Sequence, residues 1–301
     1  YEYDDEGRII SDSTTDGDTK YAYDEHGRFI SVEDKNGKIV YTYDDEGYIS
    51  SKTDEHNKTV NYEYDDLGYI SKIIKENNSI SYSYDIFGRI IETVDEKANK
   101  VKYTYDKVGN LVSKEYTNGV KTTYEYNALN LLVSQVTKDK EGNIIASYKY
   151  TLDENGNRIK VEELTRTIYY KYDSCDRLIS EVIEDTKGKQ ITKTTYTYDA
   201  NSNRLSKDVD GKLTRYEYNE LNQLVSEGTV SYTYDNAGNL ISVQNGDVLL
   251  SYYKYDSNNK MISAERYNGD GSTLTTSYTY NAFGDRTSKT VDGVTTYYTP
   301  V

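Results

Sequence analysis

The sequence contains few side chains that could act as nucleophiles or as general acids and bases near neutral pH. It has two histidines, His26 and His56, and one cysteine, Cys175. Both histidines fall in segments that predict turns, so we expect solvated side chains, and nothing in the sequence pairs either with a nucleophile. Cys175 also falls at a predicted turn position, and a single cysteine leaves no internal disulfide. The sequence therefore predicts no catalytic residue, and we do not expect an enzyme.

Carboxylates are abundant, but they recur along the chain, whereas an active site would be expected once. Adjacent acids occur as Asp4-Asp5, Asp44-Asp45 and Asp65-Asp66. We interpret them as turn formers. Residues 139–143 offer oxygen ligands for Ca²⁺, but the twelve-residue EF-hand loop and the glycine-rich nonapeptide of calcium-binding β-rolls are absent. We predict no metal ion and no other cofactor.

The acids belong to a repeat whose most visible element is a Tyr-x-Tyr pair. Fourteen pairs contain 28 of the 36 tyrosines, and the first six spacings are 20 or 21 residues. Later spacings vary between 16 and 26 residues, which indicates loops of variable length around a constant unit. The pairs begin at Tyr1, Tyr21, Tyr41, Tyr62, Tyr82, Tyr103, Tyr124, Tyr148, Tyr170, Tyr196, Tyr216, Tyr232, Tyr253 and Tyr278.

Each repeat predicts a β-hairpin. Ile39, Tyr41 and Tyr43 alternate along one face of a strand, and an Asp-x-x-Gly segment typical of a type I turn follows. A second turn, marked by pairs such as Asn36-Gly37 and Asp210-Gly211, leads into the next repeat. The predicted structural residues in five repeats are Tyr21, Tyr23, Asp24, Gly27, Tyr41, Tyr43, Asp44, Gly47, Tyr62, Tyr64, Asp65, Gly68, Tyr82, Tyr84, Asp85, Gly88, Tyr103, Tyr105, Asp106 and Gly109.

These hairpins predict an all-β chain: an antiparallel array of about fourteen repeats over residues 1–301, in one spiralling sheet that forms a hollow shell or a solenoid-like stack. Asn takes the place of the turn glycine at Asn130, Asn222 and Asn259, where it tolerates positive φ. We interpret three copies as carrying one extra residue after the turn, at 156–158, 202–204 and 284–286, and we expect bulges there. The sequence begins inside the pattern at Tyr1 and ends at Pro300-Val301, which indicates a segment of a longer protein.

The composition limits the partners. The formal net charge is −15, which disfavours nucleic acid, and no apolar run approaches the ~20 residues of a membrane span. The mean hydropathy of −0.87 leaves little aliphatic core, so a thin sheet covered by Tyr is expected.

The extended motif Tyr-x-Tyr-Asp-x-x-Gly-Arg-Ile/Leu-x-Ser, seen at residues 21–31 and 82–91, resembles the YD repeat. That repeat occurs in bacterial Rhs proteins, the shell of insecticidal Tc toxins, wall-associated proteins and animal teneurins, and the resemblance covers essentially the whole chain. It implies a β-sheet spiral forming a hollow shell, which in bacterial members encloses or presents a C-terminal toxin domain. Rhs proteins follow the repeats with a self-cleaving aspartyl segment, which is not found here, so self-cleavage and toxin activity are not expected of this chain.

The resemblance implies a secreted or surface-attached bacterial protein whose partners are flanking domains of the same polypeptide, including an enclosed toxin. An adhesion or carbohydrate-binding module and a fibre of copies associating through sheet edges remain alternatives. Choline-binding wall repeats are disfavoured, because their cages rely on Trp and this chain has none. Tyrosines outside the pairs are the candidate sugar platforms: Tyr48, Tyr69, Tyr116, Tyr169, Tyr252, Tyr267 and Tyr297.

Overall fold

The structure is a computed structural model that describes residues 1–15 and 17–298. The predicted chain end at Pro300-Val301 lies outside these residues. The described part contains twenty-nine β-strands and no helix, and its strands belong to one antiparallel sheet. The all-β, antiparallel prediction is therefore confirmed. No helix of the described residues could serve as a membrane span.

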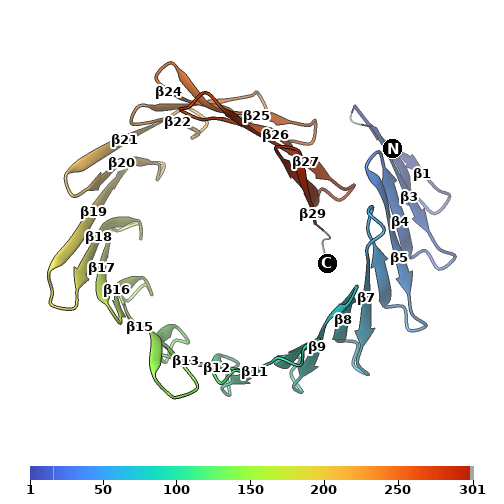
Figure 1. Cartoon of the computed structure of the whole chain (residues 1–301), viewed down its shortest axis with the longest axis horizontal. Coiled ribbons are helices and arrows are strands. Elements are labelled where there is room, and N and C mark those ends of the chain that lie inside the picture. The colour runs from blue at the N-terminus through green and yellow to red at the C-terminus, as the bar shows by residue number, and fades with distance from the viewer. Residues whose placement is uncertain (16, 299–301) are drawn as a thin grey trace. The chain divides into compact units, whose positions relative to one another are not determined.

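The chain divides into two compact units. Unit 1 comprises Tyr1–Ile80 and Thr229–Val301, and unit 2 comprises Ser81–Gly228. Strand β9 (Asn78–Tyr84) crosses the boundary between them. Within each unit, successive strands pair in antiparallel fashion in their order along the chain (Figure 1).

The strands of unit 1 are β1 (Glu2–Tyr3), β2 (Ile9–Thr14), β3 (Gly17–Tyr23), β4 (Phe29–Asp34), β5 (Gly37–Tyr43), β6 (Ile49–Thr53), β7 (Thr59–Tyr64), β8 (Ile70–Lys75), β23 (Val230–Tyr234), β24 (Leu240–Asn245), β25 (Val248–Tyr255), β26 (Met261–Tyr267), β27 (Thr273–Tyr280), β28 (Arg286–Val291) and β29 (Val294–Tyr297).

The strands of unit 2 are β10 (Ile90–Asp95), β11 (Lys100–Tyr105), β12 (Leu111–Tyr116), β13 (Lys121–Tyr126), β14 (Leu132–Lys138), β15 (Ile144–Leu152), β16 (Arg158–Glu163), β17 (Arg166–Tyr172), β18 (Leu178–Asp185), β19 (Gln190–Tyr198), β20 (Arg204–Val209), β21 (Lys212–Tyr218) and β22 (Leu224–Glu227).

We call the side of the sheet that carries the Tyr pairs the Tyr face. In unit 1, Tyr21 pairs with Val32 across β3 and β4, and Val32 pairs with Ile39 across β4 and β5. Cross-strand partners share a face, so Val32 and Ile39 lie on the Tyr face, where they are 0% and 2% exposed. The paired tyrosines are mostly half-buried. Aromatic rings, with a few aliphatic side chains, therefore make up most of the apolar layer.

A register shift recurs at the last residue of the Tyr strand in the first-turn hairpins. Tyr43 pairs with Ile49 and Thr42 with Ser51, so Ser50 is the additional residue of a bulge. The same shift occurs at Leu152↔Arg158, Tyr198↔Arg204 and Tyr280↔Arg286. The expected bulges are present, but the premise of an inserted residue was wrong. Their loops have the same length as the others, and Arg takes the place of the usual aliphatic residue.

Candidate functional site

The turn aspartate organises the backbone of each repeat. In the turn 24–27, Asp24 Oδ1 accepts hydrogen bonds from the backbone N–H groups of His26 (2.9 Å) and Arg28 (2.8 Å). The Gly27 N–H donates to the Asp24 carbonyl at 3.0 Å, and Gly27 adopts φ 78°. This is a type I turn followed by a left-handed residue, as the sequence predicts. Asn130, Asn222 and Asn259 take positive φ as expected, at 59–60°.

The residue after the turn glycine links one repeat to the next. Arg28 Nε donates to Asp24 Oδ2 at 2.6 Å, and its guanidinium lies 4.6 Å from the centre of the Tyr43 ring in the following repeat. The equivalent hydrogen bond from the Arg89 side chain holds the pKa of Asp85 below its usual value. The same arrangement recurs at Arg8 with Tyr23, Arg89 with Tyr105 and Arg177 with Tyr198.

The second tyrosine of each pair also bonds back to the preceding repeat. Tyr43 Oη donates to the carbonyl oxygen of Phe29 at 2.6 Å. The pairing of β4 with β5 begins at Ser31 with Val40, two residues after Phe29. The tyrosine therefore bonds a backbone carbonyl that lies outside this strand pairing. Burial raises the pKa of Tyr43, which keeps its hydroxyl protonated and able to donate.

We call this contact the tyrosine tie. It recurs in both units, with lengths from 2.6 to 3.2 Å. Sequence reasoning assigned these rings to the sheet surface but missed the role of the hydroxyl. The tie joins Tyr23 to Ile9, Tyr43 to Phe29, Tyr64 to Ile49, Tyr105 to Ile90, Tyr126 to Leu111, Tyr172 to Arg158, Tyr198 to Leu178, Tyr218 to Arg204, Tyr255 to Leu240 and Tyr280 to Met261.

The tyrosines proposed as sugar platforms do not gather at one place. Tyr48 occupies the position of Arg28 in its repeat and stacks on Tyr64, with ring centres 4.8 Å apart. Tyr267 Oη donates to Glu265 Oε2 at 2.6 Å. Tyr297 packs edge-on against His56, with ring centres 4.7 Å apart. Tyr69 and Tyr116 are each 40% exposed.

Tyr169 and Tyr252 lie in two open grooves that occupy equivalent positions in different repeats. The groove at Tyr169 has a volume of about 540 Å³ and includes Ile159 and Asp153. The groove at Tyr252 has a volume of about 530 Å³ and includes Ile241 and Asp235, at the corresponding places. Each groove combines an aromatic ring, aliphatic side chains and carboxylates, which is a composition suited to a polar ligand with an apolar face.

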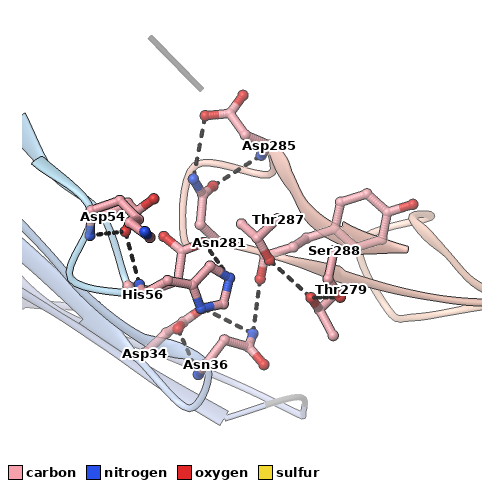
Figure 2. Close-up of polar contacts among 12 residues, drawn as sticks. Asp34, Asn36, Asp54, His56, Thr279, Asn281, Asp285, Thr287 and Ser288 are labelled. Atoms are coloured by element: carbon pink, nitrogen blue, oxygen red, sulfur yellow. Dashed lines mark hydrogen bonds and ion pairs between the residues drawn. The ribbon is translucent and has the colours of Figure 1, made fainter. Parts of the chain in front are cut away.

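A buried polar cluster lies within unit 1, where the turn 281–284 and strand β28 approach the turns that follow β4 and β6 (Figure 2). Asn36 Nδ2 donates to the Tyr280 carbonyl at 2.9 Å, and Asn281 Oδ1 accepts from the Asp285 N–H at 2.9 Å. Thr279 and Ser288 hydroxyls lie 2.7 Å apart. Asn281, Thr287 and Ser288 are all buried. We call this contact region the junction.

His56 is the one predicted turn histidine that the junction partly covers. It lies in a turn as expected, but its side chain is only 29% exposed, because Tyr297 packs on it; His26 is 66% exposed. Cys175 is exposed, and its N–H donates to Asp173 Oδ1. Within residues 1–15 and 17–298, no group of three His, Cys, Asp or Glu side chains is arranged to hold a metal ion.

Two family models match the chain: Teneurin YD-shell over residues 1–118 and RHS Repeat over residues 105–144. Together these matches cover residues 1–144 and support a YD-repeat family for the chain. The YD-shell match supports a shell scaffold. No curated protein matches the chain.

Solved structures share the YD-repeat fold. A crystal structure of TcdB2-TccC3-Cdc42 matches with a TM-score of 0.63 and 15% identity over 96% of this chain and 20% of that chain. A crystal structure of TcdB2-TccC3 matches with a TM-score of 0.59 and 15% identity over 95% of this chain and 21% of that chain. This chain thus spans about a fifth of the length of the structures that it matches.

Proposed function

We propose that this chain is a wall segment of an extracellular bacterial shell, which encloses or presents a toxin domain of the same polypeptide. The observation that carries the proposal is the tyrosine tie, repeated through both units of a chain whose first 118 residues match the YD-shell family. A thin sheet has little core of its own, so bonds between successive repeats supply stiffness that a container wall needs.

In this proposal the Tyr face lies toward the enclosed segment. Its rings are half-buried, and many of its second tyrosines already donate their hydroxyls to backbone carbonyls. The face therefore combines aromatic rings with charged side chains of both signs, such as Lys114 opposite Tyr103 and Glu181 opposite Tyr170. Such a mixed surface favours weak, unspecific contact with an enclosed chain. Nothing in this role requires turnover of a substrate.

The test uses the full-length polypeptide that contains this chain, with limited proteolysis of the domain that follows the repeats. Replacing Tyr43, Tyr64 and Tyr105 together by Phe removes three ties, at about 1 kcal/mol each. We expect that domain to be cleaved at least ten times faster in this variant. The matched control replaces Tyr41, Tyr62 and Tyr103, which make no tie among the described residues, and should leave protection unchanged. Equal cleavage in both variants would contradict the enclosing role.

Carbohydrate binding is a second candidate, favoured by the equivalent grooves at Tyr169 and Tyr252. A sugar ring would stack on the tyrosine while the carboxylates accept its hydroxyl protons. A glycan array should give hits that the pair Tyr169→Ala and Tyr252→Ala abolishes. Tyr116→Ala, which changes an exposed ring outside both grooves, is the control. An array without hits would remove this candidate.

A further inference from the structure

The fourth residue of every first turn adopts positive φ, and residues of two kinds fill this position. In each of the fourteen first turns of the described chain, its N–H donates a hydrogen bond to the carbonyl of the turn's first residue. Gly occupies the position in nine turns, and the other five carry Asn130, Asp176, Ser202, Asn222 and Asn259. Gly and Asn both tolerate positive φ, so the backbone conformation does not decide between them.

The identity of this fourth residue follows the residue that comes after the preceding first turn, which we call the post-turn residue. Each asparagine at the post-turn position is followed, in the next first turn, by Asn or Asp: Asn110 by Asn130, Asn157 by Asp176, Asn203 by Asn222 and Asn239 by Asn259. Other post-turn residues are followed by Gly, and Arg177 with Ser202 is the one exception. The pairs with Gly are Arg8 with Gly27, Arg28 with Gly47, Tyr48 with Gly68, Tyr69 with Gly88, Arg89 with Gly109, Leu131 with Gly156, Gln223 with Gly238 and Lys260 with Gly284. The two positions therefore vary together along the chain.

Each asparagine at the post-turn position builds an amide bridge to the next turn. Asn110 Nδ2 donates to Asp106 Oδ2 of its own turn at 2.9 Å and to Asn130 Oδ1 of the next turn at 3.0 Å. The other three asparagines also bind the aspartate of their own turn. Their bonds to the next turn measure 2.7–2.8 Å and join Asn157 to Asp176, Asn203 to Asn222 and Asn239 to Asn259. Gly at the fourth position would offer no side-chain acceptor, so the asparagine amide would lose this bond.

Longer post-turn residues occupy the space that a side chain at the next fourth residue would need. A Cβ at Gly68 would lie 2.9 Å from Tyr48 Cζ, and still closer to the Tyr48 hydroxyl. A Cβ at Gly156 would lie 3.3 Å from Leu131 Cδ1. Gly188, the fourth residue of a second turn, has the same positive φ, yet a Cβ there would meet no described atom within 4 Å. The crowding therefore comes from the post-turn residue and not from the turn itself.

Arginine at the post-turn position gives a graded exclusion. A Cβ at Gly47 would lie 4.0 Å from Arg28 Nη1, which is an ordinary contact. In the exceptional pair, Arg177 Nη1 donates to the Asp199 carbonyl at 2.9 Å and to Ser202 Oγ at 3.3 Å. A flexible guanidinium can thus accommodate a short hydroxyl side chain by binding it, which the ring of Tyr48 or the aliphatic side chain of Leu131 cannot do.

We infer that the post-turn residue and the next fourth residue form a pairing code, by which the first-turn edge of each hairpin selects the hairpin that packs beside it. An asparagine edge accepts a hairpin whose first turn ends in Asn or Asp, and a longer residue accepts one whose first turn ends in Gly. The backbone bonds between strands are alike in all hairpins, so they do not select a neighbour. A hairpin with Tyr48 placed before Asn130 would clash, and one with Asn110 placed before Gly156 would lack its acceptor. The code concerns the order of the hairpins and does not depend on the shell function.

A double-mutant cycle at Tyr48 and Gly68 tests the code in unit 1. Amide hydrogen exchange of strands β6 to β8 measures local opening around this pair. Gly68→Asn alone should speed exchange about tenfold, because the new side chain meets the Tyr48 ring. The double variant with Tyr48→Asn should exchange no faster than Tyr48→Asn alone, because the amide bridge can then form. The control, Gly188→Asn, places Asn at an open left-handed position and should change exchange in β18 and β19 by no more than about twofold.

The opposite change tests the code in unit 2 with residues that other repeats already carry, so these variants should fold. Asn110→Leu alone should speed exchange in β12 to β14 about tenfold, because it removes the bridge and places leucine against the Asn130 side chain. Adding Asn130→Gly, which copies the pair of Leu131 with Gly156, should reverse most of that increase. Circular dichroism checks that each variant keeps its β-sheet content. If the rate increase in each double variant equals the product of its two single increases, the two positions act independently and the code is overturned.

Discussion

Two turns of unit 1 share the tripeptide Asp-Glu-His, at residues 24–26 and 54–56, yet their side chains differ sharply in exposure. Glu25 and His26 are 88% and 66% exposed, whereas Glu55 and His56 are 2% and 29% exposed. The backbone is the same in both, because each aspartate Oδ1 accepts two turn N–H groups. Identical local chemistry thus gives the same turn, and distant residues decide its surroundings.

The covered turn lacks the side-chain partners of the exposed one. Arg28 binds Asp24 Oδ2, but Lys58, at the equivalent position, binds Glu76 instead. Asp54 Oδ2 and both Glu55 carboxylate oxygens have no hydrogen-bond partner in the described part of the chain, and Glu55 Oε1 lies 3.7 Å from His56 Nε2. Burial of unpaired carboxylates is costly, so the packing of the junction must offset that cost.

Two glycines give the largest expected difference in stability, because Gly37 lies against the covered turn and Gly17 does not. Gly17 and Gly37 both begin a strand after a second turn, with φ 131° and 139°. A Cβ at Gly37 would lie 2.6 Å from Glu55 Cβ, while the nearest atom at Gly17 is Lys35 Cδ at 3.8 Å. Gly17→Ala should cost about 2 kcal/mol through backbone strain, and Gly37→Ala about 2 kcal/mol more through displacement of the covered turn. Urea unfolding measures both, and equal costs would mean that Glu55 does not pack there.

Neutralising the glutamates should change stability in only one of the turns. Glu55→Gln removes a buried charge that has no hydrogen-bond partner in the described part of the chain, and we expect the free energy of unfolding to rise by about 1–2 kcal/mol. Glu25→Gln changes an exposed side chain and should stay within about 0.5 kcal/mol of the parent chain. Thermal and urea unfolding at neutral pH provide the comparison. Destabilisation by Glu55→Gln would show that the carboxylate is paired and favourable.

The histidines give the smallest expected difference. His56→Ala removes the edge-on contact with Tyr297 and should cost about 1 kcal/mol. His26→Ala should have almost no effect on stability, because His26 makes no ring contact among the described residues and is 66% exposed. Hydrogen exchange of the β29 amides should speed up only in the first variant. Unchanged exchange there would argue against His56 as a support for this strand.

Features fixed by neighbouring residues could be predicted from the sequence, and those fixed at a distance could not. The turn at Asp24 and the left-handed Asn130 follow from local chemistry and were predicted correctly. Arg204 was mistaken for the sign of an insertion, because an arginine stands where most repeats have an aliphatic residue. The partial burial of His56 depends on Tyr297, more than 200 positions later, so no local pattern reports it.

The tyrosine tie could have been recognised from a signal in the sequence. The residue before the first turn is Tyr in thirteen repeats and Leu152 in the other, and it is never Phe, although Phe would give the same apolar area. A position that carries Tyr in place of Phe indicates a hydrogen bond. What the sequence could not show is the acceptor, since the carbonyl of Phe29 is identified only by the register of the hairpins.

The tyrosine tie also bears on how such a chain changes in length over evolutionary time. Donor and acceptor lie in successive repeats, usually 14 or 15 residues apart, as for Tyr43 with Phe29 and Tyr64 with Ile49. A duplication or deletion of one whole repeat therefore leaves every remaining hydroxyl with a carbonyl to bind. As far as the ties are concerned, unequal recombination between repeats would be tolerated, so the number of hairpins is a quantity that selection can adjust without redesigning any tyrosine tie.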